Sequence, residues 1–165
     1  FIGRELASMT IGIIGFGRLG KFMSKFAKSF GMKVVYYDPY VNSKMAKKVT
    51  LKKLIKSSDA ISIHVHVNKN TKYMINQKIL DLSTRKPYII NTSRGEVVDE
   101  ADIYKSLKKK IISGYATDVL EYEFEDIRMS PIYKASKEDL ITILLALQRQ
   151  CFVLGNNVKN LLSQW

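Results

Sequence analysis

Residues 10–38, TIGIIGFGRLGKFMSKFAKSFGMKVVYYD, are the stretch that decides the fold. The short apolar run 11–14 is typical of a strand buried on both faces in a parallel sheet. The sequence GFGRLG follows at once and matches the pattern G-x-G-x-x-G. Apolar side chains then recur at helical spacing over 19–30, and a second apolar run, 34–37, ends on an aspartate. The stretch therefore predicts a strand, a glycine turn, a helix and a second strand.

The glycines of this motif have different predicted roles. Gly15 allows the tight turn, Gly17 lets the backbone approach a pyrophosphate, and Gly20 lets the helix pack closely on the strand. The start of the helix offers unpaired N–H groups to phosphates. Asp38 lies 18 residues after Gly20, where an acidic side chain accepts hydrogen bonds from the adenosine ribose. We therefore predict a dinucleotide site, and an ordinary glycine turn is the alternative.

The residue at position 38 also bears on which dinucleotide is bound. An aspartate there repels a 2′-phosphate, and the following Pro39 and Tyr40 supply no compensating arginine. We therefore expect NAD rather than NADP.

Composition narrows the possible partners. The chain has 165 residues, which suits one domain, and its formal net charge of +12 raises the possibility of nucleic-acid binding. However, it holds 21 lysines and only 6 arginines, and the lysines are spread along helix faces. No apolar run is long enough to span a membrane, and the single cysteine, Cys151, is compatible with a reducing compartment. We therefore expect a cytoplasmic protein with no nucleic-acid partner, no membrane partner and no metal.

Strand and helix patterns alternate along the rest of the chain. We expect further strands at 60–67, 87–91 and 111–117, and helices at 51–56, within 71–82, and from Asp99 through Lys109. A basic amphipathic segment at 43–48 and a C-terminal helix at 151–162 complete the pattern. This order predicts an α/β fold with a doubly wound parallel sheet, the Rossmann dinucleotide-binding fold. We expect residues 1–165 to form a single dinucleotide-binding domain.

In such a sheet the ligand crevice lies at the carboxyl ends of the strands, so the residues that follow strands are candidates. Arg94 follows one strand and could bind a carboxylate and polarise a neighbouring carbonyl, or be a surface residue in a turn. Asp118 follows the next strand and could accept a hydrogen bond from a carboxamide, or cap a turn. His64 and His66 alternate with valines and could contact a ligand, although structural histidines are commoner.

The ordered segments GIIGFGRLG, YDPY, ISIHV, NTSRGEVVDE and GYATDVLEYE resemble the NAD-binding domain of the D-isomer-specific 2-hydroxyacid dehydrogenases, over residues 3–142. The resemblance implies an enzyme that uses NAD to oxidise a D-2-hydroxy acid or to reduce a 2-keto acid. It also implies a homodimer formed chiefly through this domain.

The resemblance assigns roles to individual residues. Arg94 matches the arginine that binds the substrate carboxylate and polarises its keto group, and Asp118 matches the acid that holds the nicotinamide carboxamide. Glu123 matches the acid that pairs with the catalytic histidine. His66 stands where the family usually has a proline, and Phe124 replaces another proline. The resemblance and the motif together give the expected cofactor-binding residues as Gly15, Gly17, Arg18, Leu19, Gly20, Asp38, Pro39, His66, Thr92, Ser93 and Asp118.

One departure from the family bears on catalysis. The family has a Pro-His pair after the last strand, and Leu144 occupies the place of that histidine. A leucine cannot transfer a proton, so an acid/base contribution on the order of 10²–10⁴-fold is missing. The family's separate substrate domain is also expected to be absent. We therefore expect an NAD-binding domain that is inactive by itself, and the alternative is a non-catalytic module for NAD sensing or dimerisation.

Overall fold

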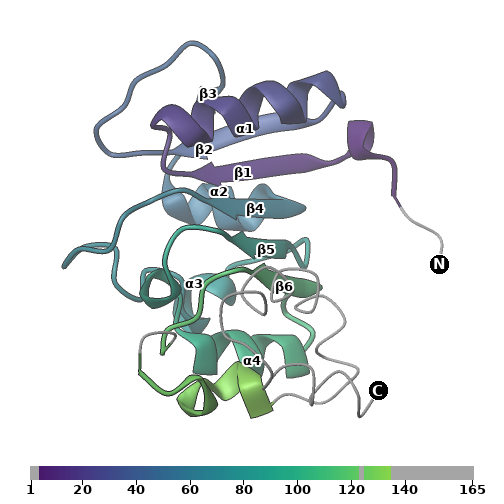
Figure 1. The fold of residues 1–165 in the computed structure, drawn as a ribbon. Helices are drawn as coiled ribbons and strands as arrows, with labels where there is room; N and C mark the ends of the chain where they lie inside the picture. Colours follow the sequence, from purple (N-terminus) through teal and green to yellow (C-terminus); the bar gives the residue numbers. More distant parts are fainter. Residues whose placement is uncertain (1–3, 123–124, 135–165) are drawn as a thin grey trace, which may run out of the picture.

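A computed structural model describes residues 4–122 and 125–134 of the chain (Figure 1). The strands are β1 (Thr10–Ile14), β2 (Lys33–Tyr37), β3 (Lys47–Lys48), β4 (Ala60–Ile63), β5 (Tyr88–Asn91) and β6 (Gly114–Thr117). The α-helices are α1 (Arg18–Ser29), α2 (Leu51–Ser57), α3 (Gln77–Leu80) and α4 (Glu100–Lys108). Short 3₁₀ turns occupy Leu6–Ser8, Gly95–Val97, Ile127–Met129 and Pro131–Lys134.

The six strands form one parallel sheet in the order β3-β2-β1-β4-β5-β6 (Figure 1). The chain runs outward from β1 to β3, then crosses back and runs outward again from β4 to β6. Strand order therefore reverses between β1 and β4, which is the point where such sheets bind ligands. This topology confirms the predicted doubly wound α/β fold.

The core consists of two clusters on opposite faces of the sheet, because successive side chains of a strand point to opposite faces. Ile13 of β1 packs in the cluster that includes Ala27 of α1 and Tyr36 of β2. The next residue, Ile14, belongs to the larger cluster that contains Leu54 of α2 and Ile103 of α4. Helices on both faces bury the strands, which explains why the strands are almost continuously apolar.

The predicted strand at 60–67 is wrong beyond Ile63. Its last paired residue is Ile63, opposite Asn91 of β5, which is itself the last residue of that strand. Beyond this point β5 offers no further partner, and the alternating His-Val sequence leaves the sheet as a loop. The alternation therefore continued in the sequence after the hydrogen-bonded ladder had ended.

The structure also differs from the prediction at 111–117 and at 43–48, and the strand predicted at 87–91 begins at Tyr88. The strand predicted at 111–117 begins at Gly114, because the backbone N–H groups of Ile111 and Ile112 donate to the Ser106 carbonyl at the end of α4. The amphipathic segment predicted at 43–48 forms turns and the short edge strand β3.

Two helices begin or end at residues typical of helix boundaries. The Asp99 side chain caps α4 by accepting a hydrogen bond from the Asp102 N–H, and α4 ends at Lys108, one residue earlier than predicted. Gly31, after α1, has a φ of +76°, the left-handed conformation expected of a helix-terminating glycine.

Several predicted features fall on residues that the structure does not describe. Glu123, Phe124, Leu144 and the helix predicted at 151–162 lie outside the described residues. Within the described residues, no helix has the length and apolar character needed to cross a membrane.

Candidate functional site

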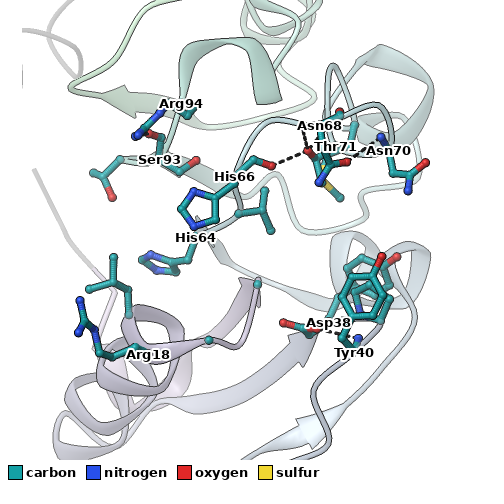
Figure 2. Close-up of a pocket in the computed structure, with 18 residues that line it drawn as sticks. Arg18, Asp38, Tyr40, His64, His66, Asn68, Asn70, Thr71, Ser93 and Arg94 are labelled. Carbon is teal, nitrogen blue, oxygen red and sulfur yellow. Dashed lines mark hydrogen bonds between the residues drawn. The ribbon is translucent and has the colours of Figure 1, made fainter.

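A cleft of about 720 Å³ lies at the carboxyl ends of β1, β2, β4 and β5 (Figure 2). The last residue of β2 and residues that follow the four strands line it: Gly15, Gly17, Arg18, Leu19, Tyr37, Asp38, Pro39, Tyr40, His64, Val65, His66, Asn68, Asn70, Thr71, Met74, Thr92, Ser93 and Arg94. Its volume is in the range of small-molecule and cofactor sites. The cleft therefore occupies the position where the topology predicts a ligand.

The glycines of the turn after β1 meet different constraints. Gly15 has a φ of +88°, and a Cβ there would lie 2.5 Å from the His64 carbonyl oxygen. A Cβ on Gly20 would lie 2.1 Å from the Gly15 carbonyl oxygen. By contrast, a Cβ on Gly17 would have no neighbour within 4 Å. The protein's own packing thus requires glycine at positions 15 and 20, whereas the space at Gly17 is open to the cleft.

The N-terminus of α1 is open to the cleft. Its N-cap residue, Gly17, has no side chain to accept a hydrogen bond, and the first turn contains no acidic residue. The Gly17 carbonyl accepts the hydrogen bond that closes the first turn of the helix, from the Lys21 N–H at 3.0 Å. The exposed residues Arg18 and Leu19 lie before Lys21 in the first turn. An uncapped helix N-terminus of this kind favours an anion through its N–H groups and dipole.

Asp38 is held in place by backbone N–H groups. One carboxylate oxygen accepts from Phe16 at 2.8 Å, and the other accepts from Tyr40 at 2.8 Å and from Val41 at 2.9 Å. Burial acts to raise the pKa of Asp38, but these bonds outweigh it, and the pKa lies below the ordinary value of 3.8. Asp38 is therefore ionised at neutral pH. A carboxylate has about four acceptor positions, so three N–H groups leave one for a ligand.

The loop after β4 crosses the middle of the cleft (Figure 2). The Thr71 hydroxyl closes this loop by donating to the His66 carbonyl at 2.6 Å and accepting from the Asn68 N–H at 2.8 Å. The His64 ring nitrogen Nε2 lies 2.9 Å from the Ser62 hydroxyl oxygen. Figure 2 shows the two histidine side chains between the start of α1 and the Ser93–Arg94 turn.

The turn after β5 is organised by the buried Asn91 side chain. Its Nδ2 donates to the Arg94 carbonyl at 2.9 Å, and its Oδ1 accepts from the Ser93 N–H at 3.1 Å. The Thr117 hydroxyl donates to the Asn91 carbonyl at 3.0 Å, which ties this turn to the end of β6. Arg94 itself is exposed and lines the cleft. The turn is therefore anchored by Asn91, while the Arg94 side chain is accessible from solvent.

Most of the predicted cofactor residues lie together in this cleft. Gly20 does not line it and instead packs against the turn. Asp118 follows β6 and is half-buried, outside the set that lines the cleft. Among the described residues, no group of three or more His, Cys, Asp or Glu side chains is arranged to hold a metal ion.

His64 lines the cleft, as one of the two histidines that the sequence suggested could contact a ligand. Several other cleft residues were not predicted from the sequence, namely Tyr37, Tyr40, Val65, Asn68, Asn70, Thr71 and Met74. Most of them belong to the loop after β4, but only Val65 falls within the strand predicted at 60–67, and the others follow it. The rule that ligands contact the residues after each strand already pointed to the loop beyond residue 67, and a strand end at Ile63 would have added Val65 to it.

The chain is similar in sequence to one family and to several known reductases and dehydrogenases. Residues 1–145 match the family described as D-isomer specific 2-hydroxyacid dehydrogenase, NAD binding domain. The chain is 40% identical to a glyoxylate reductase of Thermococcus litoralis over 151 residues, which cover 88% of this chain and 44% of that protein. It is 34% identical to the D-3-phosphoglycerate dehydrogenase of Bacillus subtilis over 128 residues, which cover 74% of this chain and 24% of that protein.

Solved structures agree with this comparison. A D-lactate dehydrogenase of Aquifex aeolicus, in complex with NAD and lactic acid, matches with a TM-score of 0.73 and 34% identity over 88% of this chain and 45% of that one. A D-2-hydroxyisocaproate dehydrogenase matches with a TM-score of 0.73 and 35% identity over 78% of this chain and 40% of that one. The chain thus spans less than half the length of these relatives. It belongs to the NAD-binding domain family of the D-isomer-specific 2-hydroxyacid dehydrogenases.

Proposed function

We propose that the cleft binds NAD, with the diphosphate over the start of α1 and the adenosine ribose at Asp38. The observation that carries the proposal is the open space at Gly17, where a Cβ would meet no protein atom within 4 Å. The packing of the chain does not require a glycine at this position, but the close approach of a diphosphate does. The uncapped first turn of α1 and the remaining acceptor position of Asp38 support the same assignment.

We propose NAD rather than NADP for this site. The Asp38 carboxylate is buried and ionised, and its hydrogen-bond donors are backbone groups. A 2′-phosphate would therefore meet a fixed negative charge. A ribose with both hydroxyl groups free can instead donate to that charge.

The reaction we propose is the interconversion of a 2-keto acid and a D-2-hydroxy acid, for which NAD supplies the hydride acceptor. Arg94, at the cleft, would bind the substrate carboxylate and polarise the carbonyl to be reduced. Asp118 would hold the carboxamide. Glu123 matches the acid that pairs with the family's acid/base histidine, and with Leu144 in the place of that histidine it would have lost this partner. The membership of the family supports these roles.

Leu144 replaces the acid/base histidine of the family, and this substitution favours a second function. We propose that the chain binds NAD without catalysing turnover by itself, as an NAD-sensing or dimerisation module would. Turnover assays with NADH and a short 2-keto acid such as glyoxylate distinguish the two functions. Turnover above that of an Arg94→Ala variant would contradict the non-catalytic alternative.

We extend the proposal to a homodimer in the cytoplasm. Four large apolar side chains along α1 and at the residue after it support dimer formation, since they are between 50% and 62% exposed: Leu19, Phe22, Phe26 and Phe30. Such a stripe on a soluble protein marks a contact surface, and a two-fold axis would pair it with itself in a second copy. Light scattering tests this, because the double substitution Phe22→Ser and Phe26→Ser should convert a dimer into monomers.

The experiment that tests the proposed function is an NADH titration of the wild-type chain and of Gly17→Val by isothermal calorimetry. The φ of Gly17 is −71°, which any residue adopts, so the variant should lose no more than about 1 kcal/mol of stability. Its branched side chain would fill the diphosphate position, and we expect NADH affinity to fall at least about 30-fold, or roughly 2 kcal/mol. Equal NADH affinities of the two proteins would overturn the proposed location of the diphosphate.

A further inference from the structure

The backbone of His64 is fixed against the glycine turn. Its N–H donates to the Ile14 carbonyl at 2.7 Å, and its carbonyl oxygen lies 2.5 Å from where a Cβ of Gly15 would stand. His64 also lines the cleft (Figure 2). The side chain therefore starts from a point beside the first glycine of the motif, on the side of the cleft where α1 begins.

The His64 ring is oriented by Ser62. The hydroxyl oxygen of Ser62, a residue only 3% exposed, lies 2.9 Å from Nε2 of the ring. Ser62 precedes His64 by two residues, so both side chains project from the same side of the chain. Among residues 4–122 and 125–134, the His64 ring is the hydrogen-bond partner of the Ser62 hydroxyl. A buried hydroxyl needs an acceptor for its proton, and Nε2 is positioned to be that acceptor.

This orientation determines which ring nitrogen donates. When Ser62 donates to Nε2, the proton of the neutral imidazole resides on Nδ1. Burial lowers the pKa of His64 from its ordinary value of 6.5, so the ring is neutral at pH 7. Nδ1–H is then the ring's remaining hydrogen-bond donor. A flip of the ring would break the hydrogen bond between Ser62 and Nε2, so this bond fixes the ring orientation.

We propose that His64, oriented by Ser62, is a further cofactor-binding residue whose Nδ1–H donates to the diphosphate. The assignment rests on the proposed function, because it requires the cofactor to lie in this cleft. The diphosphate is the expected acceptor because His64 abuts the glycine turn and the start of α1, whereas Asp38 serves the ribose. A hydrogen bond to an anionic oxygen is stronger than one between neutral groups.

Two substitutions of His64 distinguish the contributions of its two ring nitrogens to cofactor binding. The amide of His64→Asn places a donor near the position of Nδ1, whereas the longer His64→Gln places its amide near Nε2 and can retain only the Ser62 contact. Each variant is titrated with NADH, with ADP-ribose and with adenosine by isothermal calorimetry. ADP-ribose has the diphosphate without nicotinamide, and adenosine has no phosphate.

We expect His64→Gln to bind NADH and ADP-ribose about tenfold or more weakly than the wild type, with adenosine affinity unchanged. His64→Asn should stay within about threefold of the wild type for all three ligands. The proposal is overturned if His64→Gln binds NADH normally, if both variants lose affinity equally, or if the loss extends to adenosine. A wild-type chain that binds neither NADH nor ADP-ribose would instead overturn the proposed function itself.

Ser62→Ala provides a second measurement that does not depend on the folding of the histidine variants. Removing the hydroxyl frees the ring, and we expect NADH and ADP-ribose to bind about threefold more weakly. Ser29→Ala, which removes an exposed serine hydroxyl at the far end of α1, is the matched control. NADH affinity of Ser62→Ala equal to that of this control contradicts the proposal.

Discussion

Two buried aspartates at opposite ends of the sheet have different partners. Asp38 follows β2 at the cleft and is 8% exposed, while Asp59 precedes β4 at the opposite end and is 3% exposed. Backbone N–H groups hold Asp38. Asp59 accepts from the Thr10 N–H at 2.8 Å and pairs with Arg4 at 2.9 Å and Arg85 at 3.0 Å.

The comparison indicates what makes a buried carboxylate available to a ligand. Asp59 also accepts three hydrogen bonds, but two of them come from guanidinium groups that neutralise its charge, so Asp59 joins the segments of Arg4, β1 and Arg85. Backbone N–H groups hold Asp38, and the charge of Lys48 acts on it without a hydrogen bond to the carboxylate, so one acceptor position is left for a ligand in the cleft. We therefore expect substitution of Asp59 to affect chiefly stability and substitution of Asp38 to affect chiefly cofactor binding.

The largest expected effect is that of Asp59→Ala on the free energy of unfolding. The substitution leaves the Thr10 N–H without its acceptor and removes two ion pairs. We expect the unfolding free energy to fall by about 2–4 kcal/mol. This is toward the lower end of the loss expected when a buried ion pair is broken, because both arginines are about half exposed. Urea denaturation measures it, with the exposed Asp81→Ala as control. A loss equal to that of the control would contradict the structural role, as would a changed NADH affinity of the folded protein.

The sequence predicted the position of Asp38 but not its partners. An acidic residue after the second strand is part of the dinucleotide motif, so its place at the cleft follows from spacing alone. The N–H of Phe16 lies 22 positions earlier in the chain and reaches Asp38 only because β1 and β2 are parallel neighbours. Asp59 carries no motif, and its pairing with arginines 55 and 26 positions away is a property of the tertiary fold.

The sheet shows the same division between local and tertiary information. Apolar runs identified β1, β2 and β5, because burial on both faces requires them. The edge strand β3 consists of two exposed lysines and has no apolar pattern to detect. The end of β4 at Ile63 depends on the length of its neighbours, so the alternation of His and Val misidentified the loop that holds His64. Local patterns therefore predicted the scaffold better than the loops of the site.

The next effect in size is that of Asp38→Asn on cofactor affinity. Asparagine can still accept from Tyr40 and Val41 through its oxygen, but its NH₂ group cannot accept from Phe16. We expect NADH to bind about tenfold to 30-fold more weakly, with a loss of only about 1 kcal/mol in unfolding free energy. A calorimetric titration with NADPH then tests whether the Asp38 charge is what disfavours a 2′-phosphate. Loss of the negative charge should bring the NADPH and NADH dissociation constants closer together, and an unchanged ratio would contradict the proposed NAD preference.

The smallest expected effect is on the pH dependence of the unfolding free energy, to which the buried carboxylates Glu100 and Asp59 contribute differently. Burial raises the pKa of Glu100 above its ordinary value of 4.5, even though the Ser130 hydroxyl and the Glu121 N–H donate to it. For Asp59 burial also acts to raise the pKa, but the Thr10 N–H and the arginines outweigh it, and the pKa lies below 3.8.

These opposite shifts give opposite pH dependences. The stabilisation by Asp59 is full above about pH 3.8 and is lost as the pH falls through its folded-state pKa. The contribution of Glu100 is full below about pH 4.5 and is lost as the pH rises through its folded-state pKa. Unfolding free energies of the wild type, Asp59→Asn and Glu100→Gln between pH 2.5 and pH 8 measure both. The advantage of the wild type over Asp59→Asn should shrink toward acid, and its free energy relative to Glu100→Gln should fall by about 1 kcal/mol from pH 4 to pH 8. Parallel curves for Glu100→Gln and the wild type would mean that Glu100 is as easily ionised in the folded chain as in the unfolded one, so that the hydrogen bonds from Ser130 and Glu121 fully offset its burial.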